Sequence, residues 1–265
     1  MLETRKDLAA IVLDDAMEAP QARGTASGQR PLASGPATNR KLPASPAYLL
    51  KYYWWAYVHP NALKFFDRQW MVELILWGNY GKLRDVALDA LGDALPGRTL
   101  QVAAAYGDLT PLLANRVAKG GGALDVIDVL PIQLANVRAK LDSTAPVKTS
   151  LMDSSALDFE DGAFDRAVVF FLMHEQPEDI RCKTIAETFR VVRPGGRIVI
   201  VDYARPAWWN PYRYLFRPVL ALLEPFALDM WRHEVADFLP KDDAGRGRKR
   251  RSFFGGLYQL VTIER

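Results

Sequence analysis

The stretch Thr99-Leu100-Gln101-Val102-Ala103-Ala104-Ala105-Tyr106-Gly107-Asp108-Leu109-Thr110 decides the fold of this chain. It predicts a short apolar strand, a tight turn at 106–108 and the start of a helix. A doubly wound α/β sheet binds nucleotide-like ligands at such a turn. The next apolar run, 123–127, is followed by Asp128, about 20 residues after the turn, where a carboxylate can accept both hydroxyls of a ribose. The stretch therefore predicts a nucleotide-binding α/β domain.

Strands and helices alternate regularly after this turn. Apolar runs at 147–152, 165–172 and 197–202 predict further strands, and helical segments connect them. This alternation is typical of a mostly parallel sheet with right-handed crossovers. For the final apolar run, 257–263, we expect a closing antiparallel hairpin.

Composition excludes several classes of protein. The chain of 265 residues can bury one sizeable core, and its net charge of +3 gives no reason to expect a nucleic-acid partner. The one cysteine, Cys182, excludes an internal disulfide framework and a cysteine metal cluster, and it suits a reducing cytoplasm. We find neither a signal-peptide pattern nor an apolar run of about 18 residues, and so expect a cytoplasmic protein without a spanning helix.

The chain divides into three expected regions. Residues 1–45 are rich in small and turn-forming residues and are interpreted as a flexible N-terminal segment. Residues 46–97 contain the aromatic run 48–57 and then a helical pattern, which favours a lid over the second substrate; core packing is the alternative role for these aromatics. Residues 98–265 form the expected α/β domain.

An insertion at 205–251 interrupts the alternation. Its first part, Arg205-Pro206-Ala207-Trp208-Trp209-Asn210-Pro211-Tyr212-Arg213-Tyr214-Leu215-Phe216-Arg217, mixes Trp, Tyr and Arg with apolar residues. This composition is typical of a surface at a bilayer interface, although packing on the N-terminal helices is the alternative. The basic run at 241–251 is usually a solvated loop, but it can also meet anionic lipid head groups. We therefore expect peripheral contact with the inner membrane.

Two further runs resemble a known superfamily. Asp161-Gly162-Ala163-Phe164-Asp165 and Arg190-Val191-Val192-Arg193-Pro194-Gly195-Gly196-Arg197 resemble class I S-adenosylmethionine-dependent methyltransferases, most of all the ubiquinone/menaquinone biosynthesis branch. The resemblance implies a Rossmann-like class I methyltransferase fold.

The turn and three other motifs are more specific. Together with Phe66-Asp67-Arg68-Gln69-Trp70, Leu76-Trp77-Gly78-Asn79-Tyr80 and Phe253-Phe254-Gly255-Gly256-Leu257-Tyr258-Gln259-Leu260, the turn resembles the rhodoquinone biosynthesis family over about residues 46–265. That family is implied to exchange a ring methoxy group of ubiquinone for an amino group. S-adenosylmethionine is the implied nitrogen donor, and a divalent metal, with manganese as the expected ion, assists.

The turn departs from the ordinary cofactor-binding pattern, which has an acidic residue in the strand and three alternating glycines. Aligned on Gly107, these positions are Gln101, Ala103 and Ala105. An amine without a nearby carboxylate has a lower pKa, and only a neutral amine can add to a quinone carbon. The two alanines and Tyr106 also add bulk that can shift the cofactor, so we interpret the turn as favouring nitrogen transfer.

The resemblance also implies the site residues. The methionine part of the cofactor is expected at the turn, the ribose at Asp128, and the adenine at Asp153 and Ser154. The implied cofactor-binding set is Gln101, Ala103, Ala105, Tyr106, Gly107, Asp108, Asp128, Val129, Asp153, Ser154, Leu172 and Met173. The expected catalytic residues are His174, Glu175 and Tyr106. The expected metal ligands are Asp108, His174 and Glu175, all with hard or borderline donor atoms.

Two other functions stay open. One is an ordinary quinone C- or O-methyltransferase, which would give a methylated product. The other is a non-catalytic, membrane-associated protein of the same fold, which the altered turn favours and the retained Asp128 and Asp153 oppose. The sequence leaves the oligomeric state open.

Overall fold

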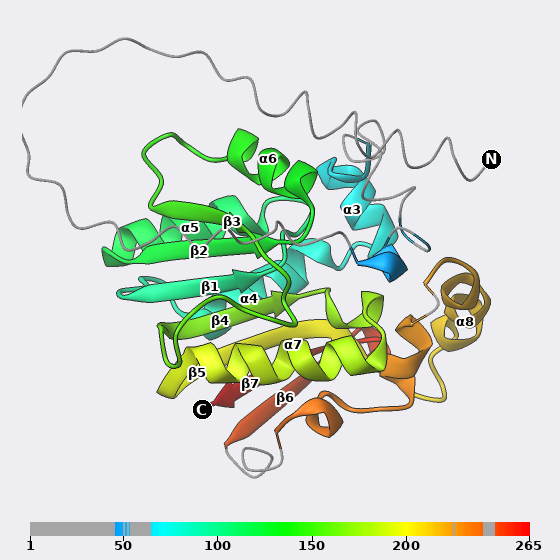
Figure 1. The fold of residues 1–265 in the computed structure, drawn as a ribbon. Helices are drawn as coiled ribbons and strands as arrows, with labels where there is room; N and C mark the ends of the chain where they lie inside the picture. Colours follow the sequence, from blue (N-terminus) through cyan, green and yellow to red (C-terminus); the bar gives the residue numbers. More distant parts are fainter. Residues whose placement is uncertain (1–45, 50, 52, 54–64, 225, 241–246) are drawn as a thin grey trace, which may run out of the picture. The chain divides into compact units, whose positions relative to one another are not determined.

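The apolar runs form one seven-stranded sheet in the computed structural model, which describes residues 46–49, 51, 53, 65–224, 226–240 and 247–265 (Figure 1). The strands are β1 (Arg98–Val102), β2 (Ala123–Asp128), β3 (Val147–Leu151), β4 (Phe164–Phe170), β5 (Val192–Tyr203), β6 (Arg248–Phe253) and β7 (Tyr258–Glu264). Their order is β3-β2-β1-β4-β5-β7-β6. The first five strands are parallel, and β7 is antiparallel to both β5 and β6. The predicted mostly parallel sheet with a closing antiparallel hairpin is confirmed.

Helices cover both faces of the sheet. The α-helices are α3 (Gln69–Ile75), α4 (Tyr80–Leu91), α5 (Leu109–Gly120), α6 (Pro131–Lys140), α7 (Glu178–Val191) and α8 (Tyr212–Leu223). The short 3-10 helices are η2 (Met173–Glu175), η3 (Ala227–Trp231), η4 (Val235–Phe238) and η5 (Phe254–Gly256). In Figure 1, α7 lies on one face of the sheet, and α4 and α5 lie on the other. This double covering explains why the central strands read as nearly continuous apolar runs.

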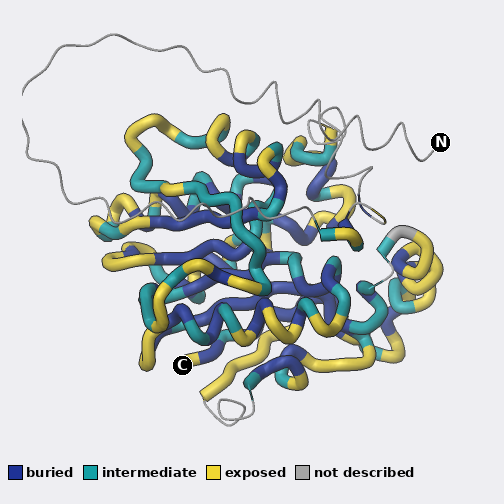
Figure 2. Tube along the Cα trace, in the orientation of Figure 1, coloured by how far each residue is buried: buried dark blue, intermediate teal, exposed yellow. Residues whose placement is uncertain are grey.

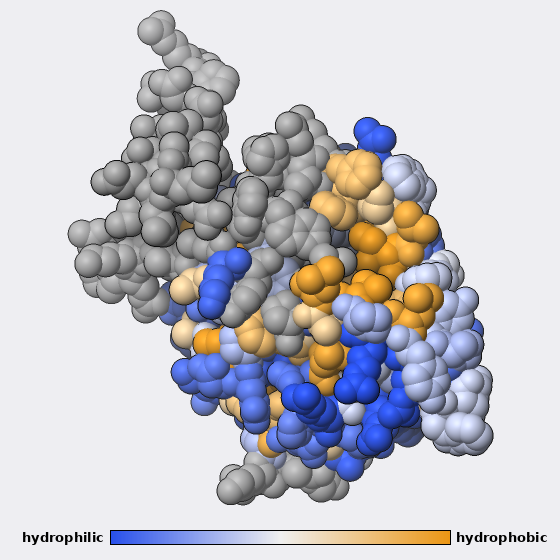
Figure 3. Space-filling model, turned by 90° about the vertical axis from the view of Figure 1, so that its right-hand side faces the viewer, coloured by the Kyte–Doolittle hydropathy of each residue, from blue (hydrophilic) through white to orange (hydrophobic). Residues whose placement is uncertain are grey.

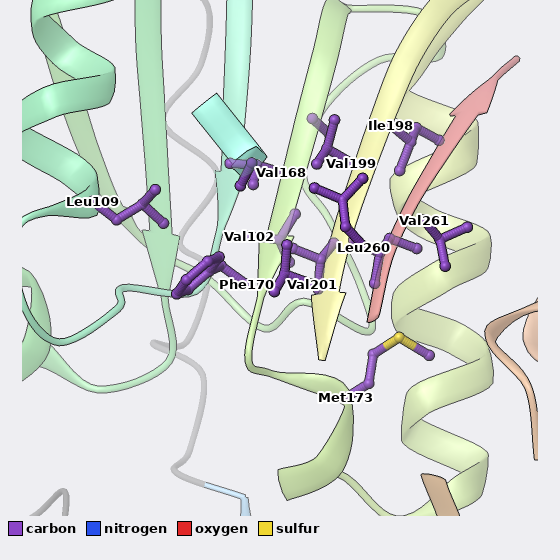
Figure 4. Close-up of a cluster of buried hydrophobic side chains, with 14 of the residues drawn as sticks. Val102, Leu109, Val168, Phe170, Met173, Ile198, Val199, Val201, Leu260 and Val261 are labelled. Atoms are coloured by element: carbon purple, nitrogen blue, oxygen red, sulfur yellow. The ribbon is translucent and has the colours of Figure 1, made fainter. Parts of the chain in front are cut away.

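The core lies in the central strands. Val168, Val199 and Val201 are fully buried, and Figure 2 shows the same strands as a buried band through the molecule. Figure 4 shows side chains along β4, β5 and β7 in one cluster of buried hydrophobic residues. The loops that follow the parallel strands are therefore anchored on strands that pack in this buried cluster.

The strand order changes direction at β1: β2 and β3 lie on one side of β1, and β4 and all later strands lie on the other side. Because β1 pairs with β2 on one side and with β4 on the other, the loops after these strands part and leave a crevice. The turn at 106–108, Asp128 and residues 171–175 all follow strands at this edge.

Several local predictions need correction. Within the helical pattern of residues 46–97, the apolar spacing from Ala62 to Trp77 predicts one helix, but in the described part of that stretch α3 spans only Gln69–Ile75. Part of the basic run expected as a loop, residues 248–251, forms edge strand β6, whose backbone pairs with β7. The predictions for residues 1–45 and most of 48–57 lie outside the described residues. The division into a lid and a sheet domain stays a prediction.

Candidate functional site

A cavity of about 490 Å³ opens at the carboxyl ends of β1, β2 and β4. Its lining is mostly apolar, and α3 and α8 supply the part farthest from the sheet. Ten predicted site residues line it: Ala103, Ala105, Tyr106, Asp128, Val129, Asp153, Ser154, Leu172, His174 and Glu175. Four others are absent from its described lining: Gln101, Gly107, Asp108 and Met173. Met173 instead belongs to the buried hydrophobic cluster (Figure 4).

The altered turn takes an unusual conformation. The amide of Gln101 is fully buried, and its Nε2 donates a hydrogen bond to the carbonyl oxygen of Ala103 at 3.1 Å. Ala103 has a φ of 69°, in the left-handed region where a side chain costs roughly 1–2 kcal/mol. Ala103 thus holds a backbone conformation that a glycine would adopt without this cost.

Gly107 is retained for a steric reason. A Cβ at this position would lie 2.4 Å from the hydroxyl oxygen of Tyr80, the first residue of α4. That hydroxyl accepts hydrogen bonds from the backbone N–H groups of Asp108 (2.9 Å) and Leu109 (3.1 Å). Tyr80 therefore satisfies N–H groups at the start of α5, which have no partner inside the helix.

Asp108 does not join the predicted metal ligands. Both of its carboxylate oxygens accept hydrogen bonds from Nη1 of Arg84, at 2.8 and 2.7 Å. In the described part of the chain, no three His, Cys, Asp or Glu side chains form a group that can hold a metal. Asp108, His174 and Glu175 are therefore not brought together as such a group among the described residues, and their role as metal ligands stays a prediction.

Asp128 ends β2 and faces the cavity. Its Oδ2 accepts a hydrogen bond from the N–H of Ala104 at 2.9 Å, and its Oδ1 from the N–H of Leu130 at 2.8 Å. Burial raises the pKa of this carboxyl to about 6, although the backbone hydrogen bonds favour the charged form. The side chain is thus fixed between the turn and α6 at the wall of the cavity.

The two residues predicted at the adenine have polar partners nearby. Oδ1 of Asp153 accepts hydrogen bonds from the N–H and the hydroxyl of Ser155, at 2.8 and 2.7 Å. Ser154 Oγ accepts one from Nε2 of Gln176 at 3.0 Å and lies 3.0 Å from Oγ1 of Thr184. These bonds fix the rim of the cavity after β3.

His174 forms a buried pair with Asp202, which lies near the end of β5. Nδ1 of His174 lies 3.0 Å from Oδ1 of Asp202, and the N–H of Met173 donates to Oδ2 at 2.8 Å. Burial alone disfavours the imidazolium, but the charge and hydrogen bond of Asp202 outweigh it and raise the pKa of His174 to about 9. This raised pKa favours the imidazolium form of His174 at neutral pH. Its Nε2 lies 3.9 Å from Oε1 of Glu175, and both side chains line the cavity.

Aromatic rings surround this cation. The ring centroids of Tyr203 and Phe171 lie 4.8 and 5.9 Å from that of His174. Phe171 also has a left-handed backbone, with a φ of 54°. Such rings suit a flat, apolar ligand with polar oxygens at its edge.

Sequence reasoning missed several lining or supporting residues. Asp202 reads as the last residue of an apolar strand, and nothing near it in sequence indicates His174 as its partner. Tyr80 lies in the motif 76–80, but its contact with the turn depends on packing between α4 and α5. Glu224 lines the cavity from the end of α8, and burial raises the pKa of its carboxyl.

Comparisons with known proteins agree with this geometry. A model of the ubiE/COQ5 methyltransferase family matches residues 63–233. The demethylmenaquinone methyltransferase of Thermus thermophilus is 29% identical over 72% of this chain and 89% of its own length. The ubiquinone/menaquinone biosynthesis C-methyltransferase UbiE of Burkholderia mallei is 30% identical over 50% of this chain and 55% of its own length.

A solved structure supports the fold alone. The SAM-dependent methyltransferase from Aquifex aeolicus aligns with a TM-score of 0.50 and 18% identity, covering 77% of this chain and 97% of that protein. Because the family model covers well over half of the sequence, including the turn, Asp128 and His174, the chain belongs to the ubiE/COQ5 methyltransferase family.

Proposed function

We propose that this protein replaces a ring methoxy group of ubiquinone by an amino group, with S-adenosylmethionine as the nitrogen donor. Family membership supports the coarser part, an S-adenosylmethionine-dependent enzyme of quinone biosynthesis. The finer part rests on the altered turn and on the charged His174 beside it.

The observation that supports nitrogen transfer is the residue type at position 101. Gln101 is an amide, whereas the ordinary cofactor-binding pattern has an acidic residue at this position. Gln101 is fully buried and hydrogen bonded to its own turn, so it offers the donor's α-ammonium no charge. Another carboxylate at the turn, Asp67, accepts a hydrogen bond from the Gly107 N–H at 2.9 Å, but Lys140 neutralises it at 2.6 Å. A less stabilised ammonium loses its proton more readily, and the neutral amine is the nucleophile.

The proposed substitution balances in atoms and electrons. The amine nitrogen forms a bond to the ring carbon, the bond to the methoxy oxygen breaks, and that oxygen takes the proton released by nitrogen and leaves as methanol. Water then releases the ring-bound nitrogen from the donor: the donor carbon becomes a ketone while the quinone takes up the two electrons as an aminoquinol.

The pair of His174 and Asp202 supplies the electrophilic assistance in this proposal. Addition of an amine to a quinone carbon places negative charge on a ring oxygen. The imidazolium of His174, in its aromatic surroundings, is suited to donate a hydrogen bond to that oxygen, where a buried donor is most effective. Asp202 keeps the proton on His174, and Glu175 is the candidate to receive the proton of the α-ammonium.

In this proposal, S-adenosylmethionine is bound by predicted residues that line the cavity. Asp128 is the proposed partner of the ribose hydroxyls, and Asp153 and Ser154 border the proposed adenine pocket. Tyr106, whose hydroxyl accepts a hydrogen bond from Nε2 of Gln133 at 3.3 Å, stands beside the proposed methionine part. Burial raises the pKa of Tyr106, so it acts as a neutral phenol.

Ordinary methyl transfer to a quinone is the second candidate, because the relatives are named as methyltransferases. The products separate the two. Purified protein is incubated with ubiquinone and S-adenosylmethionine, with and without manganese, and the quinones are identified by mass spectrometry. An aminoquinone supports the proposal, and a methylated quinone with S-adenosylhomocysteine supports the alternative. Absence of cofactor binding by calorimetry, with quinone and manganese present, would support the non-catalytic reading.

A further inference from the structure

Exposed apolar side chains gather at one end of the molecule. In the described residues, every large hydrophobic side chain that is strongly exposed lies within 65–77 or 208–222. Figure 3 faces the side that carries α8 and shows apolar side chains gathered there. We name this set the apolar rim: Phe65, Trp70, Leu74, Ile75, Trp77, Trp208, Trp209, Tyr214, Leu215, Val219 and Leu222.

The two parts of the apolar rim are joined. The ring of Trp77, after α3, lies with its centroid 5.2 Å from those of both Tyr212 and Phe216 in α8. The insertion therefore does pack on the preceding helices, as the alternative from the sequence required. This packing leaves the outer face of α8 uncovered in the described structure, where Leu222 is 82% exposed and Tyr214 is 68% exposed.

The apolar side of α8 extends beyond the side chains that it buries. Phe216 and Leu220 are buried, whereas Leu215, Val219 and Leu222 are exposed. Arg213 and Arg217, four residues apart, form a polar stripe beside them, so α8 has the separate polar and apolar sides of an interfacial helix. Exposed apolar patches of this kind mark sites of interaction with membranes or other proteins.

The apolar rim borders the cavity. Leu74, Ile75, Trp77, Leu215 and Val219 are exposed to solvent and also line the cavity. A substrate that passes through this opening meets apolar side chains from the surface to the interior. A long apolar quinone tail is matched to such a path.

The charges around the apolar rim favour an anionic surface. Residues 205–223 contain Arg205, Arg213 and Arg217 and no acidic residue. In the other part, Asp67 is paired with Lys140, and Glu73 accepts hydrogen bonds from the N–H groups at the start of α4. The exposed charges of the rim are therefore mainly basic, and basic residues near a membrane surface attract anionic lipids.

We propose that the apolar rim docks on an anionic lipid bilayer, so that the quinone passes from the membrane directly into the cavity. The docking itself follows from the exposed side chains, and its use for quinone entry rests on the proposed function. No helix among the described residues has the length and apolarity needed to cross a bilayer. The bilayer contact is thus through side chains and one surface helix, as in interfacial helices.

Vesicle sedimentation tests the docking. The full-length protein is mixed with phosphatidylcholine vesicles that contain phosphatidylglycerol, or with phosphatidylcholine alone. We expect binding that is stronger with phosphatidylglycerol and that weakens about tenfold or more in the double variant Tyr214→Glu/Leu222→Glu, because two apolar contacts are lost. The matched control is Lys183→Glu, an exposed change on α7 that alters the net charge by the same amount.

The outcomes separate docking from catalysis. Failure of the wild type to bind, or equal binding by the double variant, overturns the docking. A dimer that the double variant dissociates in sedimentation velocity also overturns it and assigns the rim to a second copy. Turnover of a short-tailed, water-soluble ubiquinone is measured separately: amination without vesicle binding leaves the proposed function standing, and vesicle binding without amination leaves the docking standing.

Discussion

Oδ1 of Asp202 lies 3.0 Å from Nδ1 of His174; both side chains are buried, and His174 lines the cavity. The pair comes from two adjacent strands, because His174 follows β4 and Asp202 is in β5. It places a protonated ring next to the proposed quinone position. Its consequences for titration and catalysis are measurable.

Asp202→Asn should lower the pKa of His174. The carboxylate is the group that outweighs burial, so its loss leaves burial as the main influence and moves the pKa below the wild-type value of about 9. NMR titration of the imidazole measures this directly. A turnover rate that falls at pH 8 more than at pH 6 would accompany the shift, whereas a merely structural Asp202 would lower both rates equally.

Alkaline pH should remove part of the folding stability. The pKa of His174 is about 9 in the folded protein against about 6.5 unfolded, so its stabilising effect is complete below about pH 6.5 and is lost as the pH rises through 9. The difference corresponds to roughly 3 kcal/mol. Denaturant unfolding from pH 6 to 10, with His174→Gln as the reference, measures it. A wild type and variant that lose stability in parallel would contradict this assignment.

Cofactor affinity should fall with acidity through Asp128. With a pKa of about 6, this side chain is mainly a carboxylate above pH 6 and mainly a neutral acid below it, and only the carboxylate accepts hydrogen bonds from both hydroxyls of the proposed ribose. Calorimetry should therefore show weaker binding of S-adenosylmethionine at pH 5 than at pH 7.5. Asp128→Ala should weaken binding at pH 7.5 by about 1.5–3 kcal/mol. Unchanged affinity in this variant would defeat the ribose assignment.

Two glycine substitutions in the turn should have opposite effects on stability. Ala103→Gly relieves a left-handed conformation and should stabilise the fold by up to about 1 kcal/mol. Ala105 is outside the positive-φ region, so Ala105→Gly should destabilise it by about 0.5–1 kcal/mol. Denaturant unfolding of the two variants compares them. If both lose stability, the strain attributed to Ala103 is absent.

Gln101→Glu should slow amino transfer and move its pH optimum upward. The substitution keeps the side-chain size and restores a negative charge near the donor's α-ammonium, which then holds its proton to higher pH. The rate should recover as the pH is raised. Because the position is fully buried, unfolding is measured in parallel, and Gln101→Met serves as an uncharged control. Loss of activity at every pH in both variants would point to structure rather than charge.

The sequence predicted the sheet, the turn and part of the cavity lining. Periodicity located the strands because both faces of the sheet are covered, and the carboxyl ends of parallel strands then had to meet at one edge. Ten of the predicted site residues line one cavity for this reason. The alignment on Gly107 also placed Ala103 at a position where the ordinary pattern has a glycine, and the backbone of Ala103 is left-handed.

The pairings of charged side chains were not predictable in the same way. Asp108 was expected among the metal ligands because its carboxylate offers hard oxygen donors, but Arg84 of α4 donates hydrogen bonds to both of these oxygens. Asp202 was treated only as a strand end, although it determines the charge of His174. Such contacts depend on side-chain direction between distant segments, which periodicity does not contain.

Transfer of labelled nitrogen tests the central claim most directly. Purified protein is incubated with ubiquinone and S-adenosylmethionine that carries ¹⁵N at the α-amine, and the quinones are examined by mass spectrometry. The account predicts ¹⁵N on the quinone ring, together with methanol and the 2-oxo form of the donor. A quinone that gains the donor's methyl group and no ¹⁵N would contradict it and make the altered turn compatible with conventional methyl transfer.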